Sequence, residues 1–329
     1  MDLRQLRYFV GIVRAGSVSR AADELNIAQS AISHHLASLE SELDKQLVTR
    51  GPKGIQLTEA GTVLYRHAEA ILRHVEFAKQ DAMTALNVPS GRVSVGLPTA
   101  IAPLVSYELF MRVREAFPQI LLHVADSNGA LLRERLLNDR LDIALLFTHQ
   151  AERGLAVEPL LMEELFYVTA DPDPSPITLA DAARRPLLVS GPSSSSRRIV
   201  QQVFNEHGLS ATWIGEIDTS SALRRAVAAG IGNAILTWCN TYDGERKAAL
   251  NCRRFADVAL VRPVGLCFSQ VGQRNPAIET VAATLKSLVR ELIEGGIWQG
   301  VSMIVRPAEP SRLPAPPSEF RIGRRMADA

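Results

Sequence analysis

The sequence has few of the features that announce a secreted protein, a membrane protein or a metalloprotein. Only three cysteines occur among 329 residues, at positions 239, 252 and 267, and their wide spacing matches neither a disulfide framework nor a metal site. No apolar run is long enough to cross a bilayer, and no basic-then-apolar leader precedes the helical pattern that starts at Asp2. We therefore expect a cytoplasmic protein that binds no membrane.

Catalytic motifs are missing as well. The seven histidines form no HExxH pair, no Gly-x-Ser-x-Gly elbow occurs, and no phosphate-binding lysine loop or GxGxxG fingerprint follows a strand. We expect no enzyme activity, no cofactor and no metal. The net charge is only +1, and residues 1–58 hold seven Lys or Arg against six acids. Any affinity for DNA must therefore come from the placement of side chains and from dimerisation.

The sequence does contain a helix-turn-helix pattern between Ser17 and Glu42. In its second helix Ile32, Leu36, Leu39 and Leu43 recur at helical spacing and are expected to share one buried face. The opposite face carries short hydrogen-bonding side chains, which suit the base edges of a major groove, although a solvated surface would look the same in an isolated helix. The residues expected to contact DNA from this helix are Gln29, Ser30, Ser33 and His34.

Residues 50–57 follow as a predicted two-stranded wing. Gly51 and Pro52 supply its turn, and Arg50 and Lys53 are placed to meet phosphate groups. The alternative is a solvated hairpin.

These segments resemble the winged helix-turn-helix of LysR-type transcriptional regulators. The motifs that carry the resemblance are LRQLRYF at 3–9, Gly16-Ser17, Ala21-Ala22-x-x-Leu25, QSAIS at 29–33, Leu39-Glu40, Leu47-x-x-Arg50 and Leu57-Thr58-x-Ala60-Gly61. Within that family, the sequence is most similar to the nitrogen assimilation control subgroup, in the segments IAQSAIS, ESELDKQL, LDIALLF and IGEID.

A long helix is predicted from Thr58, as its cap, to about Asn87. Its apolar residues repeat at spacings of three and four, the pattern of a coiled-coil seam, and docking onto another part of the same chain is the alternative. The predicted seam consists of Leu64, Ala68, Ile71, Val75, Ala78 and Ala82. The family resemblance implies an antiparallel dimer through this helix. Beyond the dimer we expect a tetramer.

From residue 91 strands and helices alternate, which is typical of a mostly parallel α/β domain. The resemblance implies a two-lobed effector domain of the periplasmic-binding-protein type II fold. We therefore expect a winged helix-turn-helix at 1–58, a linker helix and hinge at 59–90, the α/β effector domain at 91–298 and a disordered tail rich in proline and arginine at 299–329.

A ligand site is predicted between the two lobes, because small molecules bind at the carboxyl ends of strands in such domains. Polar residues follow several predicted strands there and precede helices, where open amides favour an anion. Ordinary helix capping explains each of them equally well when taken singly. The candidates are Thr99, Ala100, Ser127, Asn128, Thr148, Ser193, Ser194, Ser195 and Ser196.

Two functions compete for these features. An enzyme or solute-binding protein with an incidental helical domain would need a catalytic group or an export signal, and the sequence shows neither. We therefore expect a nucleoid-associated transcriptional regulator that binds double-stranded DNA. Its other expected partners are further copies of itself, RNA polymerase and a small polar or carboxylate effector. Regulation by its own abundance, without an inducer, is the alternative that the nitrogen-control resemblance implies.

Overall fold

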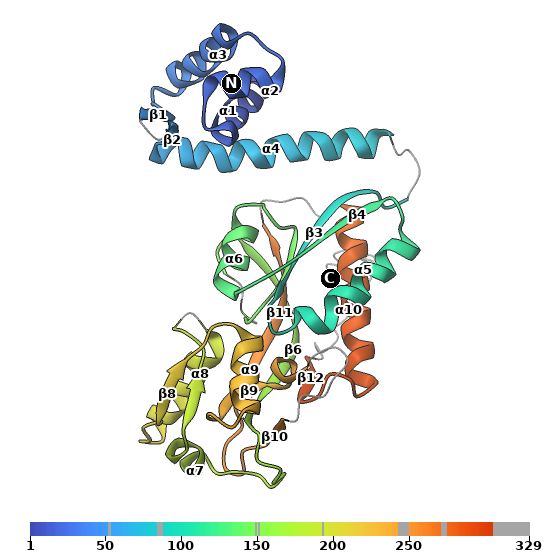
Figure 1. Ribbon diagram of the computed structural model, residues 1–329. Coiled ribbons are helices and arrows are strands. Elements are labelled where there is room, and N and C mark those ends of the chain that lie inside the picture. Colours follow the sequence, from blue (N-terminus) through green and yellow to red (C-terminus); the bar gives the residue numbers. More distant parts are fainter. Residues whose placement is uncertain are drawn as a thin grey trace, which may run out of the picture.

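The computed structural model describes residues 1–51, 54–83, 88–148, 150, 152–192, 194–242, 250–270 and 275–304, without the side chains of residues 73, 77 and 80–83. Figure 1 shows its three parts in chain order: a small helical domain, one long helix and a larger α/β domain. This is the fold class predicted from the sequence.

The first domain is built on three helices, α1 (Leu3–Ala15), α2 (Val18–Leu25) and α3 (Gln29–Leu43). A capping box between Asp2 and Gln5 starts α1, and Gly16 ends it in the left-handed conformation, at φ 65°. Ser17 occupies the predicted N-cap of α2, but its hydroxyl pairs with Ser19 instead of a backbone amide.

The wing consists of β1 (Val48–Gly51) and β2 (Gly54–Leu57), which pair antiparallel. One carboxylate joins it to α3, because Oε1 of Glu40 accepts the amide hydrogens of Leu47 and Val48 at 2.7 and 3.3 Å. Thr58 caps the next helix, α4 (Glu59–Met83), by accepting from the amide of Gly61. A Cβ at Gly61 would lie 1.8 Å from the carbonyl oxygen of Leu47, so only glycine fits at this junction.

The first half of α4 packs on the DNA-binding domain of its own chain, which corrects part of the predicted seam. Ala68 is fully buried in that domain's core, and Leu64 and Ile71 pack against the same cluster. Ala68 is therefore not available to a second chain, whereas Leu64 and Ile71 are only half-buried. Val75 is half-buried and Ala78 exposed, while the side chain of Ala82 lies outside the described part.

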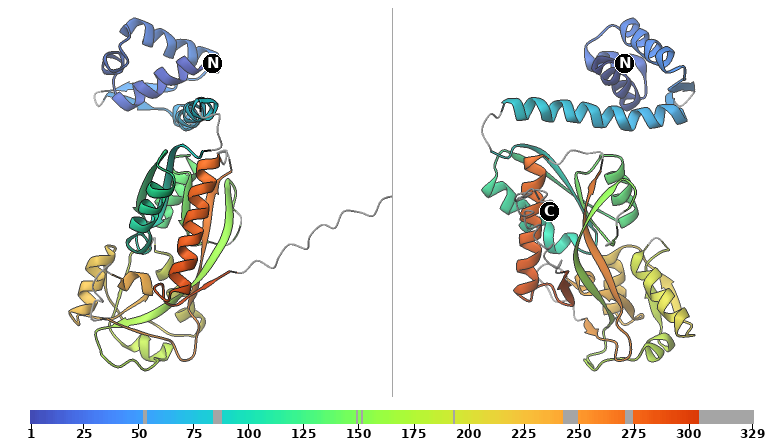
Figure 2. Two further views of the ribbon diagram at one scale, coloured as in Figure 1. Left: turned by 90° about the vertical axis from the view of Figure 1, so that its right-hand side faces the viewer. Right: turned by 180° about the vertical axis from the view of Figure 1, so that it is seen from behind.

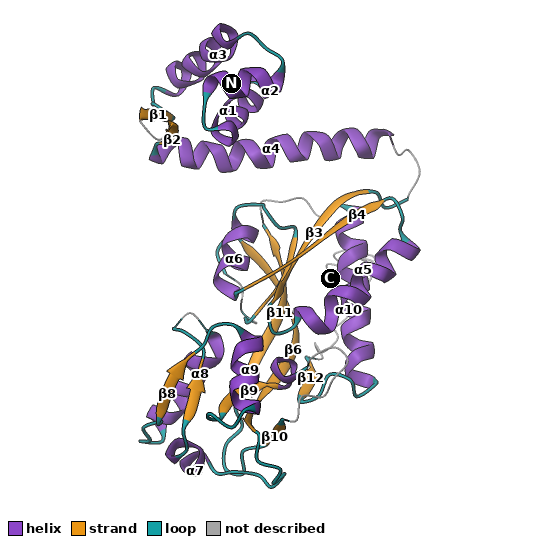
Figure 3. Ribbon diagram, viewed as in Figure 1, coloured by secondary structure: helices purple, strands orange, loops and turns teal. Residues whose placement is uncertain are grey.

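The α/β domain contains an eight-stranded sheet. Its first strands, β3 (Gly91–Pro98), β4 (Ile120–Ser127) and β5 (Ile143–Leu146), are parallel. Strands β6 (Leu155–Thr169), β9 (Ala234–Thr237), β10 (Asn251–Arg253), β11 (Val261–Ser269) and β12 (Val301–Met303) add to it antiparallel. The predicted sheet is thus parallel only on one side, because β6 and β11 run in opposite directions between the lobes (Figure 3).

The helices divide between two lobes. In the first lobe α5 (Ala102–Ala116) and α10 (Pro276–Glu294) share one core with the sheet, and α6 (Gly129–Leu137) belongs to a separate core cluster. The second lobe contains α7 (Leu179–Arg184), α8 (Ser195–Glu206), α9 (Ser220–Ala228), a short 3-10 helix (Trp238–Thr241) and the two-stranded sheet of β7 (Leu187–Val189) and β8 (Trp213–Glu216). Figure 2 shows the two lobes from the side and from behind, joined by the crossing strands.

The predicted disordered tail begins too early at residue 299. Residues 301–303 form β12, which pairs with Leu161–Glu163 of β6, and the neighbouring Trp298 is buried. Val301 and Met303 are apolar and extend the sheet, whereas the prolines begin only at 307. Residues 305–329 lie outside the described chain. No helix of the described chain is long and apolar enough to span a membrane.

Candidate functional site

Helix α3 has the two faces that its sequence predicts, except that Leu43, at its last residue, is 38% exposed. Ile32, Leu36 and Leu39 are buried against α1 and α2, and Gln29, Ser30 and His34 are exposed with Ser33 beside them half-buried. No side chain caps the start of the helix, because Ala28 occupies the N-cap. The free amide hydrogens of its first turn therefore remain available to an anion such as a phosphate group.

Two contacts fix the position of α3 on the domain. The ring of His35 packs edge-on against Tyr8 of α1, with centroids 5.0 Å apart, and Glu40 ties the far end of α3 to the wing. Arg50 is exposed on β1 of that wing, and Lys53 lies outside the described residues. A polar helix face and a cation on the wing are thus held on one rigid domain.

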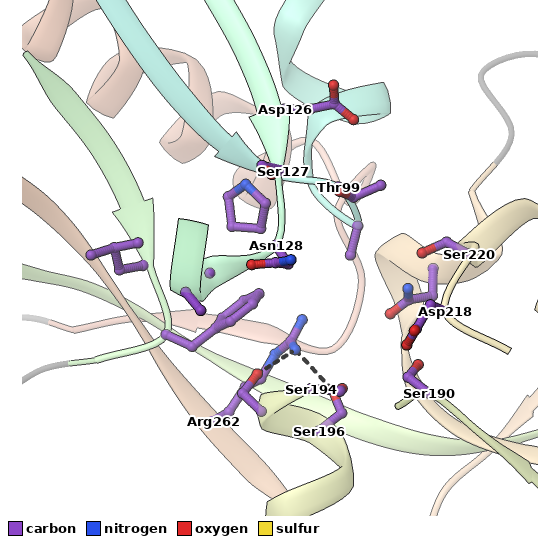
Figure 4. A pocket seen from close by; sticks show the side chains of 18 of the residues that line it. Thr99, Asp126, Ser127, Asn128, Ser190, Ser194, Ser196, Asp218, Ser220 and Arg262 are labelled. Atoms are coloured by element: carbon purple, nitrogen blue, oxygen red, sulfur yellow. Dashed lines mark hydrogen bonds between the residues drawn. The ribbon is translucent and has the colours of Figure 1, made fainter. Parts of the chain in front are cut away.

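A pocket of about 830 Å³ lies between the two lobes of the α/β domain (Figure 4). The structure brings most of the predicted ligand residues to it. Those that line it are Thr99, Ala100, Ser127, Asn128, Ser194, Ser195 and Ser196. Two predicted residues do not: Ser193 is outside the described part, and Thr148 is absent from the wall.

Thr148 does not line the pocket, because the chain turns away from the pocket after β5. Phe147 lines the pocket in its place, while the hydroxyl of Thr148 accepts from the amide of Gln150 at 3.4 Å within the turn. The turn after β5 therefore determines that Phe147, and not Thr148, lines the pocket.

Four helices begin at the pocket, and the N-terminus of each contributes a positive partial charge there. Ala100 lies just before α5, Asn128 caps α6, Ser194 caps α8, and Ser220 is the first residue of α9. The cap bonds occupy only some of the first-turn amides, and the dipole of each helix favours negative charge by about 0.3–1 kcal/mol. An anionic group bound here would be stabilised from both lobes.

The floor of the pocket is Arg262, which was not among the predicted site residues. Its side chain comes from β11 and is only 3 % exposed. The guanidinium lies 3.7 Å from the ring centre of Phe147, which belongs to the first lobe. On its other side it donates to Ser196 at 2.8 Å and Ser195 at 3.4 Å, at the start of α8 in the second lobe. Arg262 therefore contacts both walls of the pocket.

The charge of Arg262 is balanced by Glu163. These residues are direct cross-strand partners on β11 and β6, at the level where both strands pass between the lobes. Oε2 of Glu163 accepts from Nε at 2.8 Å and pairs with Nη2 at 2.6 Å, and the carboxylate is completely buried. Nη2 also donates to Thr237 at 3.3 Å. Removing one partner of such a pair typically costs about 3–5 kcal/mol, since the other charge stays buried without compensation.

A sequence signal for this pair exists in retrospect. Glu163 and Arg262 each interrupt an apolar strand, where charged residues are rarely buried unless they are paired. However, they are 99 positions apart, and only the register of β6 against β11 places them opposite each other.

The described thiols are poorly suited to redox or nucleophilic chemistry. Burial raises the pKa of Cys267 to about 12, and burial, followed by the negative charge of Glu163, raises the pKa of Cys239 well above its usual value. Burial also raises the pKa of Cys252. Since the thiolate is the reactive form, none of the three thiols is activated. The pocket is instead lined by hydroxyls, by Arg133, Arg198 and Arg262, and by the carboxylates of Asp126 and Asp218. This lining can bind a polar ligand.

Comparison with protein families finds two matches. Residues 3–62 match the bacterial regulatory helix-turn-helix protein of the lysR family, and residues 87–290 match the LysR substrate binding domain. The resemblance predicted from the sequence motifs is thereby confirmed.

Individual relatives agree with this assignment. The chain is 38% identical to the nitrogen assimilation regulatory protein nac of Escherichia coli K12 over 238 residues, which cover 72% of this chain and 78% of that protein. It is 34% identical to nac of Klebsiella aerogenes over 297 residues, covering 88% and 95%.

Solved structures share the whole architecture. A full-length OxyR variant from Pseudomonas aeruginosa superposes with a TM-score of 0.68 at 21% identity, covering 88% of this chain and 95% of that one. Full-length CbnR in complex with its target DNA gives a TM-score of 0.63 at 20% identity, covering 88% and 99%. At these identities the likeness concerns the fold.

Proposed function

The chain belongs to the LysR family of transcriptional regulators, and from that premise we propose how it binds DNA, assembles and responds to a ligand. The observation that carries the proposal is the exposed polar face of α3, which a buried apolar face holds against α1 and α2. We propose that α3 enters the major groove while Arg50 and Lys53 of the wing meet the DNA backbone. Gln29, Ser30, Ser33 and His34 are the residues assigned to base or phosphate contact.

The dimer is proposed to form through the second half of α4. Leu64, Ala68 and Ile71 are engaged by the chain's own DNA-binding domain, so Val75 and Ala78 are the described seam residues left for a partner. CbnR is a family member solved with its target DNA, and by analogy we propose that this chain binds paired half-sites as a dimer or tetramer. Two half-sites supply the affinity that its near-neutral charge does not.

The pocket is proposed to bind a small carboxylate. Its size falls in the range of about 300–1,000 Å³ that is usual for small-molecule sites. The starts of four helices and Arg198 favour an anion, whereas Arg262 is already paired with Glu163 and Arg133 with Glu152. Thr99 and Asn128 face Ser194 and Ser196 across the pocket (Figure 4). A ligand with a carboxylate at each end would bridge the lobes. Regulation by abundance alone remains the competing proposal.

The cellular setting is proposed from the relatives. The nac proteins are named for nitrogen assimilation, and we propose that this chain regulates genes of nitrogen metabolism from the cytoplasm, with RNA polymerase as a further partner. We also propose that its working units are residues 1–58, the linker at 59–90 and an effector domain from 91 that extends to 304, with the tail beyond it.

The first prediction separates base reading from phosphate contact. Gln29→Ala should lower the preference for the operator over random DNA by about 1–3 kcal/mol, because a base-specific contact is lost. Arg50→Ala should weaken binding to both DNAs alike and reduce the dependence of the binding constant on salt concentration. Mobility shifts of both variants at two salt concentrations measure these effects, and Gln56→Ala, exposed on β2, is the control. An unchanged specificity ratio in Gln29→Ala would remove Gln29 from base reading.

The second prediction concerns the dimer. Val75→Glu places a charge in the proposed seam and should convert the dimer to monomer in sedimentation velocity experiments. The matched control is Val63→Glu on the same helix, where the side chain is 43% exposed and should accept the charge without effect. If both variants sediment like the wild type, α4 does not form the dimer.

The third prediction concerns the pocket. Thr99→Val keeps the side-chain shape but removes a hydroxyl, and should weaken carboxylate binding by about 1.5–3 kcal/mol, the contribution of a hydrogen bond to a charged group. Calorimetric titration of mono- and dicarboxylates measures it, with Thr212→Val, exposed elsewhere in the domain, as the control. Binding of a dicarboxylate that is equally tight in both variants would exclude Thr99. No binding by the wild type would favour regulation by abundance.

A further inference from the structure

A buried carboxylate on the linker helix joins the two domains of the chain. Glu69 of α4 is only 8% exposed, although it lies on a helix that runs between domains. Its Oε1 accepts from the hydroxyl of Tyr65 at 2.7 Å and from Arg14 of α1 at 3.0 Å. Its Oε2 faces Arg140 of the α/β domain, with Nε at 3.8 Å. One carboxylate is therefore shared by a cation from each domain.

The interactions of Glu69 with Arg14 and with Arg140 differ in length. The bond from Arg14 has hydrogen-bond length, whereas the contact with Arg140 is an ion pair that is longer than a hydrogen bond. A second contact lies beside it, where Arg66 of α4 donates to Oδ1 of Asn138 at 3.3 Å. The α/β domain thus contacts the linker through Asn138 and Arg140.

Residues 138–140 are firmly attached to helix α6. Their amides and that of Leu141 bond back to carbonyl groups of the last turn of α6, including Arg140 to Arg135 at 2.7 Å. Asp139 adopts the left-handed conformation at φ 52°, which turns the chain sharply at this point. Arg140 is therefore fixed in position relative to the last turn of α6.

The other end of α6 forms a wall of the pocket. Asn128, Gly129, Ala130 and Arg133 all line it, and Asn128 caps the helix by accepting from the amide of Leu131 at 2.9 Å. Leu132 and Leu136 are fully buried beneath the helix, so its nine residues, about 13 Å long at 1.5 Å per residue, are held as one unit. A single short helix separates the pocket from the linker.

We propose that α6 couples the pocket to the DNA-binding domain, through Arg140 and the shared carboxylate of Glu69. The pocket end of this connection rests on the proposed effector site. The linker end rests only on the contacts of Arg66, Glu69 and Arg140. An anion bound at the start of α6 shifts the helix, the contact between Arg140 and Glu69 changes, and Arg14 carries the change to α1. Glu69 and Arg140 are positioning residues, since neither contacts DNA or ligand.

Because coupling between two sites is reciprocal, DNA can serve as the probe before any effector is known. Full-length protein is compared with and without a saturating DNA duplex at low salt, and hydrogen exchange is measured for peptides covering α3 and residues 128–141. In the wild type, DNA should slow exchange in the first turn of α6 by about fivefold. Arg140→Ala should abolish this slowing but leave the protection of α3 in place, and Arg140→Lys should retain most of it.

The matched control is Arg290→Ala, which removes the same charge from an exposed site on α10 and should behave as the wild type. If Arg140→Ala keeps the full response of α6, or if the wild type protects α3 but not α6, the coupling is wrong while the proposed DNA binding stands. A wild type that protects neither helix would contradict both.

Discussion

The arrangement of the larger domain depends on one buried ion pair. Glu163 and Arg262 face each other on β6 and β11, the two strands that pass between the lobes; Glu163 is completely buried, and Arg262 is only 3% exposed at the pocket. A buried charge is tolerated only when it is matched, so each residue fixes the position of the other. Arg262 also contacts Phe147 of the first lobe and Ser196 of the second. The pair therefore fixes the position of the two pocket walls relative to each other.

Glutamates at other junctions have a similar role. Glu40 binds two amides of the wing and so fixes the wing to α3, and Glu69 holds α1 and the α/β domain to the linker. In each case a carboxylate on one segment accepts from another, which orders the two without requiring a large apolar interface. Such polar junctions are more sensitive to changes in a neighbouring charge than apolar packing is.

The sequence predicts the parts of this molecule better than it predicts their contacts. The faces of α3, the wing and the strand-end polar residues follow from local periodicity and turn chemistry, and seven of the nine predicted pocket residues line the pocket. The failures are matters of tertiary geometry. Thr148 does not line the pocket, because the chain turns after β5 and Phe147 lines it instead. Ala68 lies at a heptad position, yet it packs within its own chain. Arg262 could not be assigned because its meaning depends on strand register. A heptad pattern identifies an apolar face of a helix, but it does not identify the segment that packs against that face.

The measurement that tests the account most directly is a double-mutant cycle on the pair of Glu163 and Arg262. The unfolding free energies of the wild type, Glu163→Leu, Arg262→Met and the double variant are determined by denaturant titration followed by tryptophan fluorescence. Each single change should destabilise the domain by about 3–5 kcal/mol, and the double variant should recover most of that loss, since no uncompensated charge remains. Strictly additive losses, or single variants that unfold like the wild type, would show that the pair does not hold the lobes.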